Sequence, residues 1–121
     1  MWKRTWYMSE RSDKVLVEDM LEAARRILAF TEGMDFNSFS RDLKTSDAVL
    51  RNLQVLGEAA KMISSETRDA YSEVEWSKII RSRHIVVHEY FGVDFEIVWR
   101  IVEVHIPVLK RQLSLVLKKM S

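Results

Sequence analysis

The sequence predicts an all-α protein, a bundle of four or five antiparallel helices. Apolar residues recur at spacings of three and four along most of the chain, which is the period of helices buried on one side. No segment shows the strict alternation of a half-buried strand. The 121 residues include only three Gly and one Pro, too few for the many turns of an all-β protein.

The first helix is predicted to begin at Ser12 or Asp13, because either side chain can cap a helix start. Gly33 can end it, since glycine favours the conformation that follows a helix. Its apolar stripe consists of Leu16, Met20, Ala23, Ile27, Phe30 and Met34.

The second long helix is predicted to begin at Thr45, Ser46 or Asp47. Its buried face consists of Val49, Leu53, Leu56, Ala60 and Ile63. Before it, residues 35–44 form a loop or short turn of helix, which we expect Phe36 and Phe39 to hold in place. After it, residues 64–71 form a polar connector with room for one helical turn.

The third helix is predicted to run from Trp76 to about Tyr90 and to end at Gly92. The segment from Ser72 to Glu75 has the spacing of a capping box and places the start of this helix.

A fourth helix follows, capped by Asp94. Pro107 is predicted to break or kink it, because proline lacks an N–H and crowds the carbonyl four residues earlier. Beyond the proline the apolar pattern continues to Lys118 and Lys119, and basic residues suit the C-terminus of a helix.

Length and composition predict one domain, formed by residues 11–121, behind a flexible N-terminal tail of residues 1–10. The ordered pattern starts just after Met8, which makes that residue a candidate native start. The absence of Cys excludes disulfide frameworks and thiolate sites. No apolar run has the length of a membrane span or signal peptide, so we expect a cytoplasmic protein that contacts no membrane. The net charge of +1 gives no general attraction to nucleic acid.

Cations and imidazoles gather in one predicted helix, between Trp76 and His88, with no acidic residue among them. They are Lys78, Arg81, Arg83, His84 and His88. Apolar residues alternate with them, so the helix is predicted to be partly buried. Burial of charged groups is costly unless they are paired, and such a conflict is typical of a functional site.

Helical geometry relates the members of this cluster. At about 100° per residue, Arg83 and Tyr90 lie within roughly 20° of each other, and His84 and His88 share a neighbouring stripe. Arg83 and His88 diverge by roughly 140°, so they meet if the long Arg side chain curls round the helix. Alternatively, two copies of the helix meet across a two-fold axis and pool two Arg and two His.

Three interpretations of the cluster remain open at this point. In the first, the helix is structural and carboxylates such as Glu58 and Glu103 neutralise its cations. In the second, His84 and His88 form a zinc site, although their only further candidate ligand is the distant His105. In the third, Arg side chains hold phosphoryl oxygens and His side chains move protons near neutral pH.

The segment Arg83-His84-Ile85-Val86-Val87-His88-Glu89-Tyr90 resembles the Arg-polar-x-x-x-His-x-Tyr signature of HepT-like toxins, which are helical ribonucleases of the HEPN superfamily. The similarity spans about residues 12 to 113. Further segments match that family in order and spacing: Asp47-Ala48-Val49, Leu56-Gly57-Glu58-Ala59-Ala60, Trp76, Tyr90-Phe91-Gly92-Val93-Asp94 and Val98-Trp99.

The resemblance implies a metal-independent endoribonuclease that is a homodimer with its cleft at the dimer axis. The RNA's own 2′-OH would attack the adjacent phosphate and leave a cyclic phosphate, so DNA would not be cut. His88 would be the general base or acid, and Arg83 would stabilise charge on the phosphoryl oxygens. His84 stands where the family usually has Asn, and supplies either a second proton-transfer group or a hydrogen-bond donor. Lys78 and Arg81 either hold flanking phosphates or are simply solvated.

The resemblance also implies a partner, an MntA-like minimal nucleotidyltransferase antitoxin that silences the toxin by adenylylating Tyr90. An added nucleotide beside Arg83 would occupy the place of the RNA phosphate. The alternative function is a non-catalytic HEPN module that binds nucleotide or the nucleotidyltransferase, and the near-neutral net charge favours it.

Four other residues are predicted to be structural. Gly57 is expected to let two helices approach closely, and Trp76 and Trp99 to anchor the core. His105 is expected to be a structural histidine.

Overall fold

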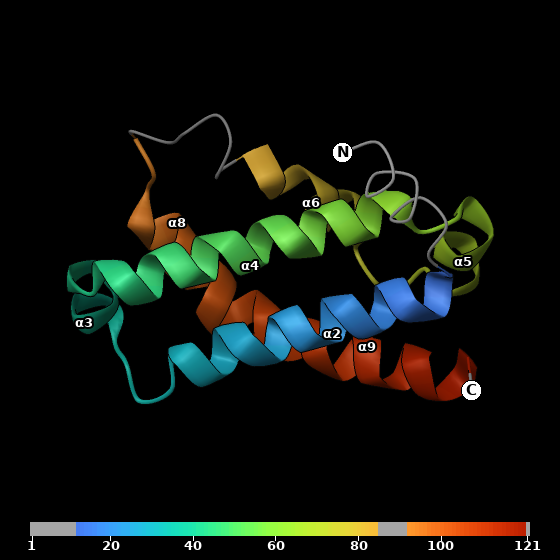
Figure 1. The fold of residues 1–121 in the computed structure, drawn as a ribbon, viewed down its shortest axis with the longest axis horizontal. Coiled ribbons are helices and arrows are strands. Elements are labelled where there is room, and N and C mark those ends of the chain that lie inside the picture. Colours follow the sequence, from blue (N-terminus) through green and yellow to red (C-terminus); the bar gives the residue numbers. More distant parts are fainter. Residues whose placement is uncertain (1–11, 85–91, 121) are drawn as a thin grey trace, which may run out of the picture.

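The computed structural model describes residues 12–84 and 92–120, and every regular element among them is helical. Figure 1 shows these elements in the order α2 (Asp13–Phe30), α3 (Phe36–Arg41), α4 (Leu43–Met62), α5 (Ser65–Ala70), α6 (Trp76–Arg81), α8 (Phe95–Arg100), the π-helical turn η1 (Ile101–His105) and α9 (Ile106–Met120). The predicted all-α class is confirmed. The predicted tail, residues 1–10 with Met8, lies outside the described residues.

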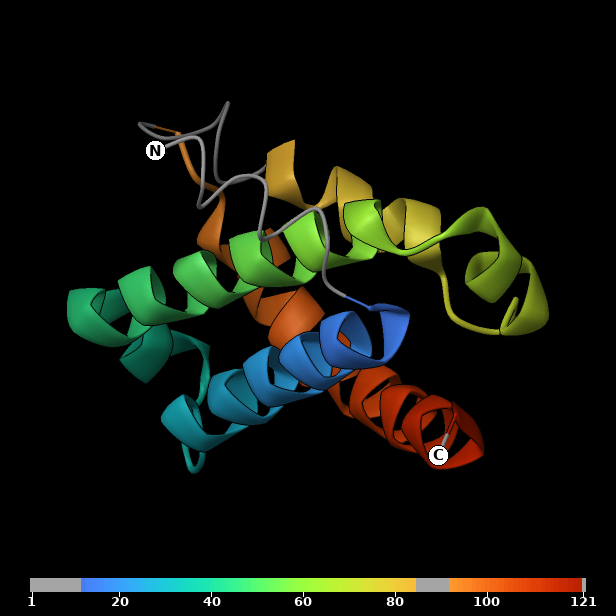
Figure 2. The ribbon, with the colours of Figure 1, turned by 45° about the vertical axis from the view of Figure 1, so that its right-hand side comes forward.

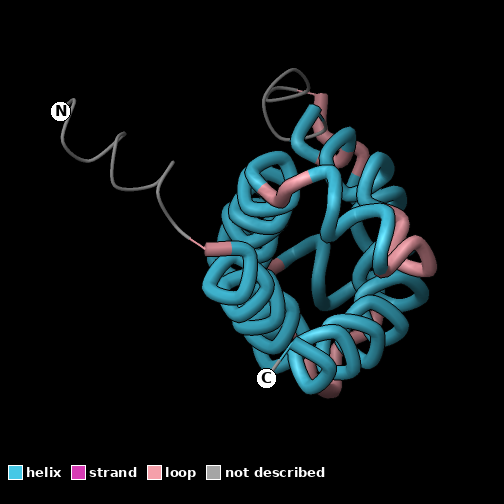
Figure 3. The backbone as a smooth tube through the Cα atoms, turned by 90° about the vertical axis from the view of Figure 1, so that its right-hand side faces the viewer, coloured by secondary structure: helices cyan, strands magenta, loops and turns pink. Residues whose placement is uncertain are grey.

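The main elements run antiparallel around one core, as predicted (Figures 1 and 2). α2 packs along both α4 and α9, and α6 packs along the other side of α4. The continuous rod α8–η1–α9 completes the bundle, which Figure 3 shows end-on. The short helices α3 and α5 lie in the connections where one helical turn was predicted.

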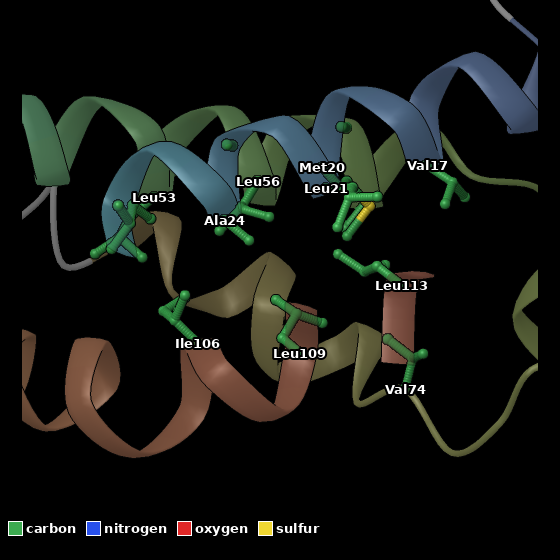
Figure 4. Close-up of a cluster of buried hydrophobic side chains, with 14 of the residues drawn as sticks. Val17, Met20, Leu21, Ala24, Leu53, Leu56, Val74, Ile106, Leu109 and Leu113 are labelled. Carbon is green, nitrogen blue, oxygen red and sulfur yellow. The ribbon is translucent and has the colours of Figure 1, made fainter. Parts of the chain in front are cut away.

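The core is formed by one stripe from each long element (Figure 4). Its labelled members come from α2, from α4, from the segment before α6 and from α9: Val17, Met20, Leu21, Ala24, Leu53, Leu56, Val74, Ile106, Leu109 and Leu113. All are buried and follow the 3.6-residue period of the sequence. Phe30, predicted for the same stripe of the first helix, is exposed at the end of α2 instead. None of the described helices combines the length and apolar character that a membrane crossing needs.

The start of α2 is capped as predicted. The Ser12 hydroxyl accepts a hydrogen bond from the Val15 backbone N–H at 3.2 Å. The carboxylate of Asp13 reaches the start of α5, where it accepts hydrogen bonds from the Ser64 N–H and from the Ser64 and Thr67 hydroxyls. Two helix starts that are distant in the sequence are therefore joined by one side chain.

The predicted start of α4 at residues 45–47 is wrong by two to four residues. α4 begins at Leu43, and Asp42 caps it by accepting hydrogen bonds from the Thr45 N–H at 3.0 Å and the Thr45 hydroxyl at 2.9 Å. Phe39, just upstream, is fully buried against Phe95 and Trp99, as an anchor of this connection should be.

One expectation for the third helix is wrong, and the other reaches beyond the described residues. Glu75 precedes α6 without a side-chain cap, so the capping box from Ser72 is not formed; the Glu75 carboxylate instead binds Lys78. α6 ends at Arg81, Ser82 forms a turn, and Arg83 and His84 are again helical. The rest of the predicted helix, up to Tyr90, lies outside the described residues. At Ser82 the hydroxyl donates to the Ile79 carbonyl at 2.6 Å, and such local bonds compete with the regular helical pattern.

Asp94 caps α8 as predicted, accepting from the backbone N–H groups of Glu96 and Ile97. The predicted distortion at Pro107 takes the form of a widened turn, η1, which ends at His105. A wider turn eases the crowding between the proline ring and the preceding carbonyls. Pro107 itself lies in the first turn of α9, which follows η1 without a gap.

Candidate functional site

The predicted site begins directly after α6. Arg83 and His84 resume helical conformation beyond the break at Ser82, with Arg83 partly buried and His84 exposed. His88 and Tyr90 lie in residues 85–91, outside the described residues. The structure therefore shows how the fold holds Arg83 and His84, the first two residues of the motif.

Arg83 lies directly against α4 at Gly57. A Cβ atom built onto Gly57 would lie 2.1 Å from Cγ and 2.8 Å from Cδ of Arg83, far inside normal contact distance. The Arg83 Nε donates a hydrogen bond to the Ile80 carbonyl at 3.3 Å. The aliphatic stem is thus packed on the neighbouring helix, and one nitrogen is bound to the preceding turn.

Carboxylates do not neutralise Arg83 within the described residues. Glu58, predicted as one partner, accepts a hydrogen bond from the Gln54 amide at 3.2 Å instead. The ion pairs of the described ranges join Arg26 to Glu22 and Lys78 to Glu75, so neither Glu58 nor Glu103 pairs with Arg83. Among the described residues, the structural interpretation therefore lacks the pairing it proposed for Arg83.

Lys78 and Arg81 lie on another side of α6. Both line a groove of about 600 Å³ between α6 on one side and η1 and α9 on the other, whereas Arg83 and His84 do not line it. The floor of this groove is apolar and includes Leu53 of α4. The turn at Ser82 lies between Arg81 and Arg83, and Arg83 packs against Gly57 of α4 instead. The structure does not bring these cations together with Arg83.

Lys78 has an acidic partner on its own helix. Its ammonium lies 2.8 Å from the Glu75 carboxylate, and both side chains are exposed. This hydrogen bond and the charge of Lys78, with a smaller contribution from His105, hold the pKa of Glu75 below its usual range. His105 is exposed and lines the same groove, away from Arg83.

The predicted zinc pair has only one member, His84, in the described part of the chain. Within residues 12–84 and 92–120, no three His, Asp or Glu side chains gather as a metal site would need. His88, the other member, lies outside these ranges.

The contact between Gly57 and Arg83 was missed by reasoning from the sequence, which predicted only a close approach of helices at Gly57. A signal was present: glycine interrupts a run of good helix formers, Leu56-Gly57-Glu58-Ala59-Ala60, at a cost of about 1 kcal/mol relative to alanine. A glycine in such a place requires a specific neighbour, but the sequence does not say which one.

The two predicted tryptophan anchors differ in burial. Trp76 is buried at the start of α6, and its indole N–H donates to the Tyr71 carbonyl at 3.1 Å. Trp99 is partly buried and packs against Phe39.

Comparison with known proteins places this architecture in a family. Residues 20–116 match the family described as "Ribonuclease HepT-like". A Methanocaldococcus jannaschii protein named "Putative RNase MJ1380" is 34% identical over 109 residues, which are 90% of this chain and all of that protein. A Thermococcus cleftensis protein named "Probable ribonuclease HepT" is 40% identical over 101 residues, 84% of this chain and 92% of that protein. No solved structure matches the chain significantly. The chain belongs to the HepT-like ribonuclease family.

Proposed function

We propose that this protein is a metal-independent endoribonuclease, the toxin of a type VII-like toxin–antitoxin pair, with its site at a homodimer interface. Family membership supports the activity. The observation that carries the proposal is the state of Arg83, which is packed on α4 without a carboxylate partner among the described residues. A guanidinium that no acid neutralises is suited to bind a phosphate.

The proposed reaction uses the RNA as its own nucleophile. The 2′-oxygen forms a bond to the adjacent phosphorus, the bond to the 5′-oxygen breaks, and the products are a 2′,3′-cyclic phosphate and a 5′-OH. His88 accepts the 2′-OH proton or donates the proton that the 5′-oxygen needs. In a two-fold dimer, two His88 side chains share these transfers. The Arg83 guanidinium stabilises the charge that develops on the phosphoryl oxygens.

Replacement of His88 tests this proposal. His88→Ala is expected to lower RNA cleavage in EDTA by at least about a hundredfold, which is the contribution typical of general acid–base catalysis. His105→Ala is the matched control, because His105 is exposed and lies away from Arg83. It should cleave RNA like the wild type. Expression of the wild type or of His105→Ala should inhibit growth, whereas expression of His88→Ala should not.

Two outcomes contradict the catalytic proposal. If His88→Ala cleaves RNA as fast as the wild type, His88 has no role in proton transfer. If the pure wild-type dimer cleaves no RNA but binds nucleotide or the nucleotidyltransferase, the protein is the non-catalytic module.

Silencing by the antitoxin is the second part of the proposal. The Tyr90 oxygen attacks the α-phosphorus of ATP, pyrophosphate leaves, and AMP remains on the tyrosine. The support is the place of Tyr90 two residues after His88, in the pattern shared with HepT-like toxins. The bulky anion would exclude the RNA phosphate from Arg83.

The intact mass of the protein tests the modification. Coexpression with an MntA-like nucleotidyltransferase should add mass in whole units of AMP, and fragmentation should place it on Tyr90. The gain should persist in Tyr71→Phe and vanish in Tyr90→Phe. An unmodified mass under coexpression would remove adenylylation from the proposal and leave control by binding alone.

A further inference from the structure

We propose that Gly57 is a positioning residue for Arg83: its missing side chain leaves a slot in α4 that the Arg83 stem occupies, which aims the guanidinium at the substrate phosphate. The inference rests on the proposed function, since it assigns a task to Arg83. It adds to that function a residue on another helix, 26 positions away in the sequence.

The neighbours of Gly57 distinguish this role from simple helix packing. A Cβ at Gly57 would clash with Cγ and Cδ of Arg83, at 2.1 and 2.8 Å. The nearest backbone atom, the Ile79 carbonyl oxygen, would lie 3.2 Å away, a tight contact that a small shift relieves. The severe clash of an alanine here is therefore with the Arg83 side chain, and its contact with the helix backbone is much milder.

A second contact completes the placement of Arg83. The hydrogen bond from its Nε to the Ile80 carbonyl fixes the near end of the guanidinium. A long side chain with many rotamers is thereby held at two points, the stem on α4 and Nε on the preceding turn. Such preorganisation favours catalysis because the donors need not be ordered when the phosphate charge develops.

Gly57→Ala is the direct test. The added methyl displaces Arg83. We therefore expect kcat for RNA cleavage to fall by about ten- to a hundredfold with KM little changed, because small misplacements of catalytic groups have effects of this size. The melting temperature should stay equal or rise, because alanine favours the helix more than glycine. Gly57→Ser, which also carries a Cβ, should behave in the same way.

Gly33→Ala is the matched control. Gly33 has a φ of +76°, and a Cβ there would meet no atom within 4 Å, so only the backbone conformation requires glycine. This variant should lower the melting temperature and leave kcat unchanged, which is the opposite pattern. A Gly57→Ala protein that loses kcat and stability together would show a structural role and overturn the inference.

The NMR signal of the Arg83 Nε–H tests the placement without any activity. It should show hydrogen bonding in the wild type and in Gly33→Ala, and it should shift in Gly57→Ala. If the wild type cuts no RNA, the proposed function fails while this signal still tests the slot. If wild type and Gly57→Ala cut RNA equally and His88→Ala does not, the inference fails and the function stands.

Discussion

Arg83 has two separable properties, its charge and its shape. The stem fills the space above Gly57, and Nε is bound to Ile80, so the terminal nitrogens are the part available to a phosphate. A planar fork holds two phosphoryl oxygens at once, whereas an ammonium holds them as a point charge.

Arg83→Lys separates these properties. Lysine keeps the charge and an aliphatic stem but loses both the Nε donor and the fork, so we expect kcat to fall by about a hundredfold, the loss typical of one preorganised donor. The pH profile should be unchanged, because the substitution leaves in place His88, to which the proposal assigns the proton transfer. Steady-state kinetics across pH measure both. Full activity in Arg83→Lys would mean that charge alone suffices.

Asp13 joins the starts of α2 and α5, and the ionisation of its carboxylate controls this link. Burial raises the pKa of Asp13, but the hydrogen bonds from Ser64 and Thr67 outweigh burial and hold the pKa below its ordinary value of 3.8. Since the folded-state pKa is the lower one, ionised Asp13 stabilises the fold above pH 3.8. That contribution is lost as the pH falls through the folded-state pKa.

Asp13→Ala is therefore expected to lower the free energy of unfolding by about 1 kcal/mol at neutral pH, a value suited to a partly exposed charged group. Urea unfolding at a series of pH values measures the difference, which should shrink on acidification below pH 3.8. Glu18→Ala, an exposed change on the same helix, should have little effect at any pH. A pH-independent loss in Asp13→Ala would exclude the carboxylate as its cause.

At the scale of elements, α6 is a short helix whose position depends on one anchor. Trp76 is 5% exposed and fixes the start of α6 through its ring and its hydrogen bond to Tyr71. The opposite end of α6 leads into Arg83, so loss of the anchor would loosen the site as well as the core.

Trp76→Ala should lower the free energy of unfolding by about 3 to 5 kcal/mol, as large truncations in protein cores do. Chemical denaturation measures it, with Ser77→Ala, an exposed neighbour, as the control. A loss below about 1 kcal/mol would mean that the region repacks and that Trp76 is no anchor.

The helices were predictable from the sequence where side chains act locally. Ser12 and Asp94 cap the next turn, and such contacts depend on spacing alone. The start of α4 was misplaced because Asp42, Thr45, Ser46 and Asp47 are all good caps. The capping box predicted before α6 does not form, because the Glu75 carboxylate pairs with Lys78 instead. The residue spacing allows either interaction and does not decide between them.

At the scale of the whole molecule, charge is nearly balanced, and the basic residues of α6 are separated from Arg83. The net charge is +1, and Lys78 and Arg81 face a groove that Arg83 does not line. Binding to RNA is therefore expected to depend on few phosphate contacts rather than on a broad basic face.

The dependence of kcat/KM on salt tests this expectation. Each phosphate contact with a single strand contributes a slope of about −0.7 in a plot of log affinity against log salt, so two or three contacts give a slope between about −1.4 and −2.1. Potassium chloride titrations of cleavage measure it. A slope steeper than about −4 would require many more basic contacts than Arg83 and its neighbours provide.

The proposed Arg–His motif could be recognised in the sequence, whereas the contacts that surround Arg83 could not. Arg83 and His84 stood out because cations in a partly buried helix conflict with packing, and that conflict is visible in the sequence. The contact of Arg83 with Gly57 joins two helices, and no local spacing encodes which turn of α4 faces α6.

Cleavage of an RNA that carries a single 2′-deoxy nucleotide at the mapped cleavage site tests the proposed chemistry most directly. The wild-type protein, in EDTA, should cut the unmodified RNA to a 2′,3′-cyclic phosphate and leave the deoxy position intact, because that position lacks the attacking oxygen. Cleavage of both substrates at the same rate, or complete loss of cleavage in EDTA, would contradict the mechanism assigned to Arg83 and His88.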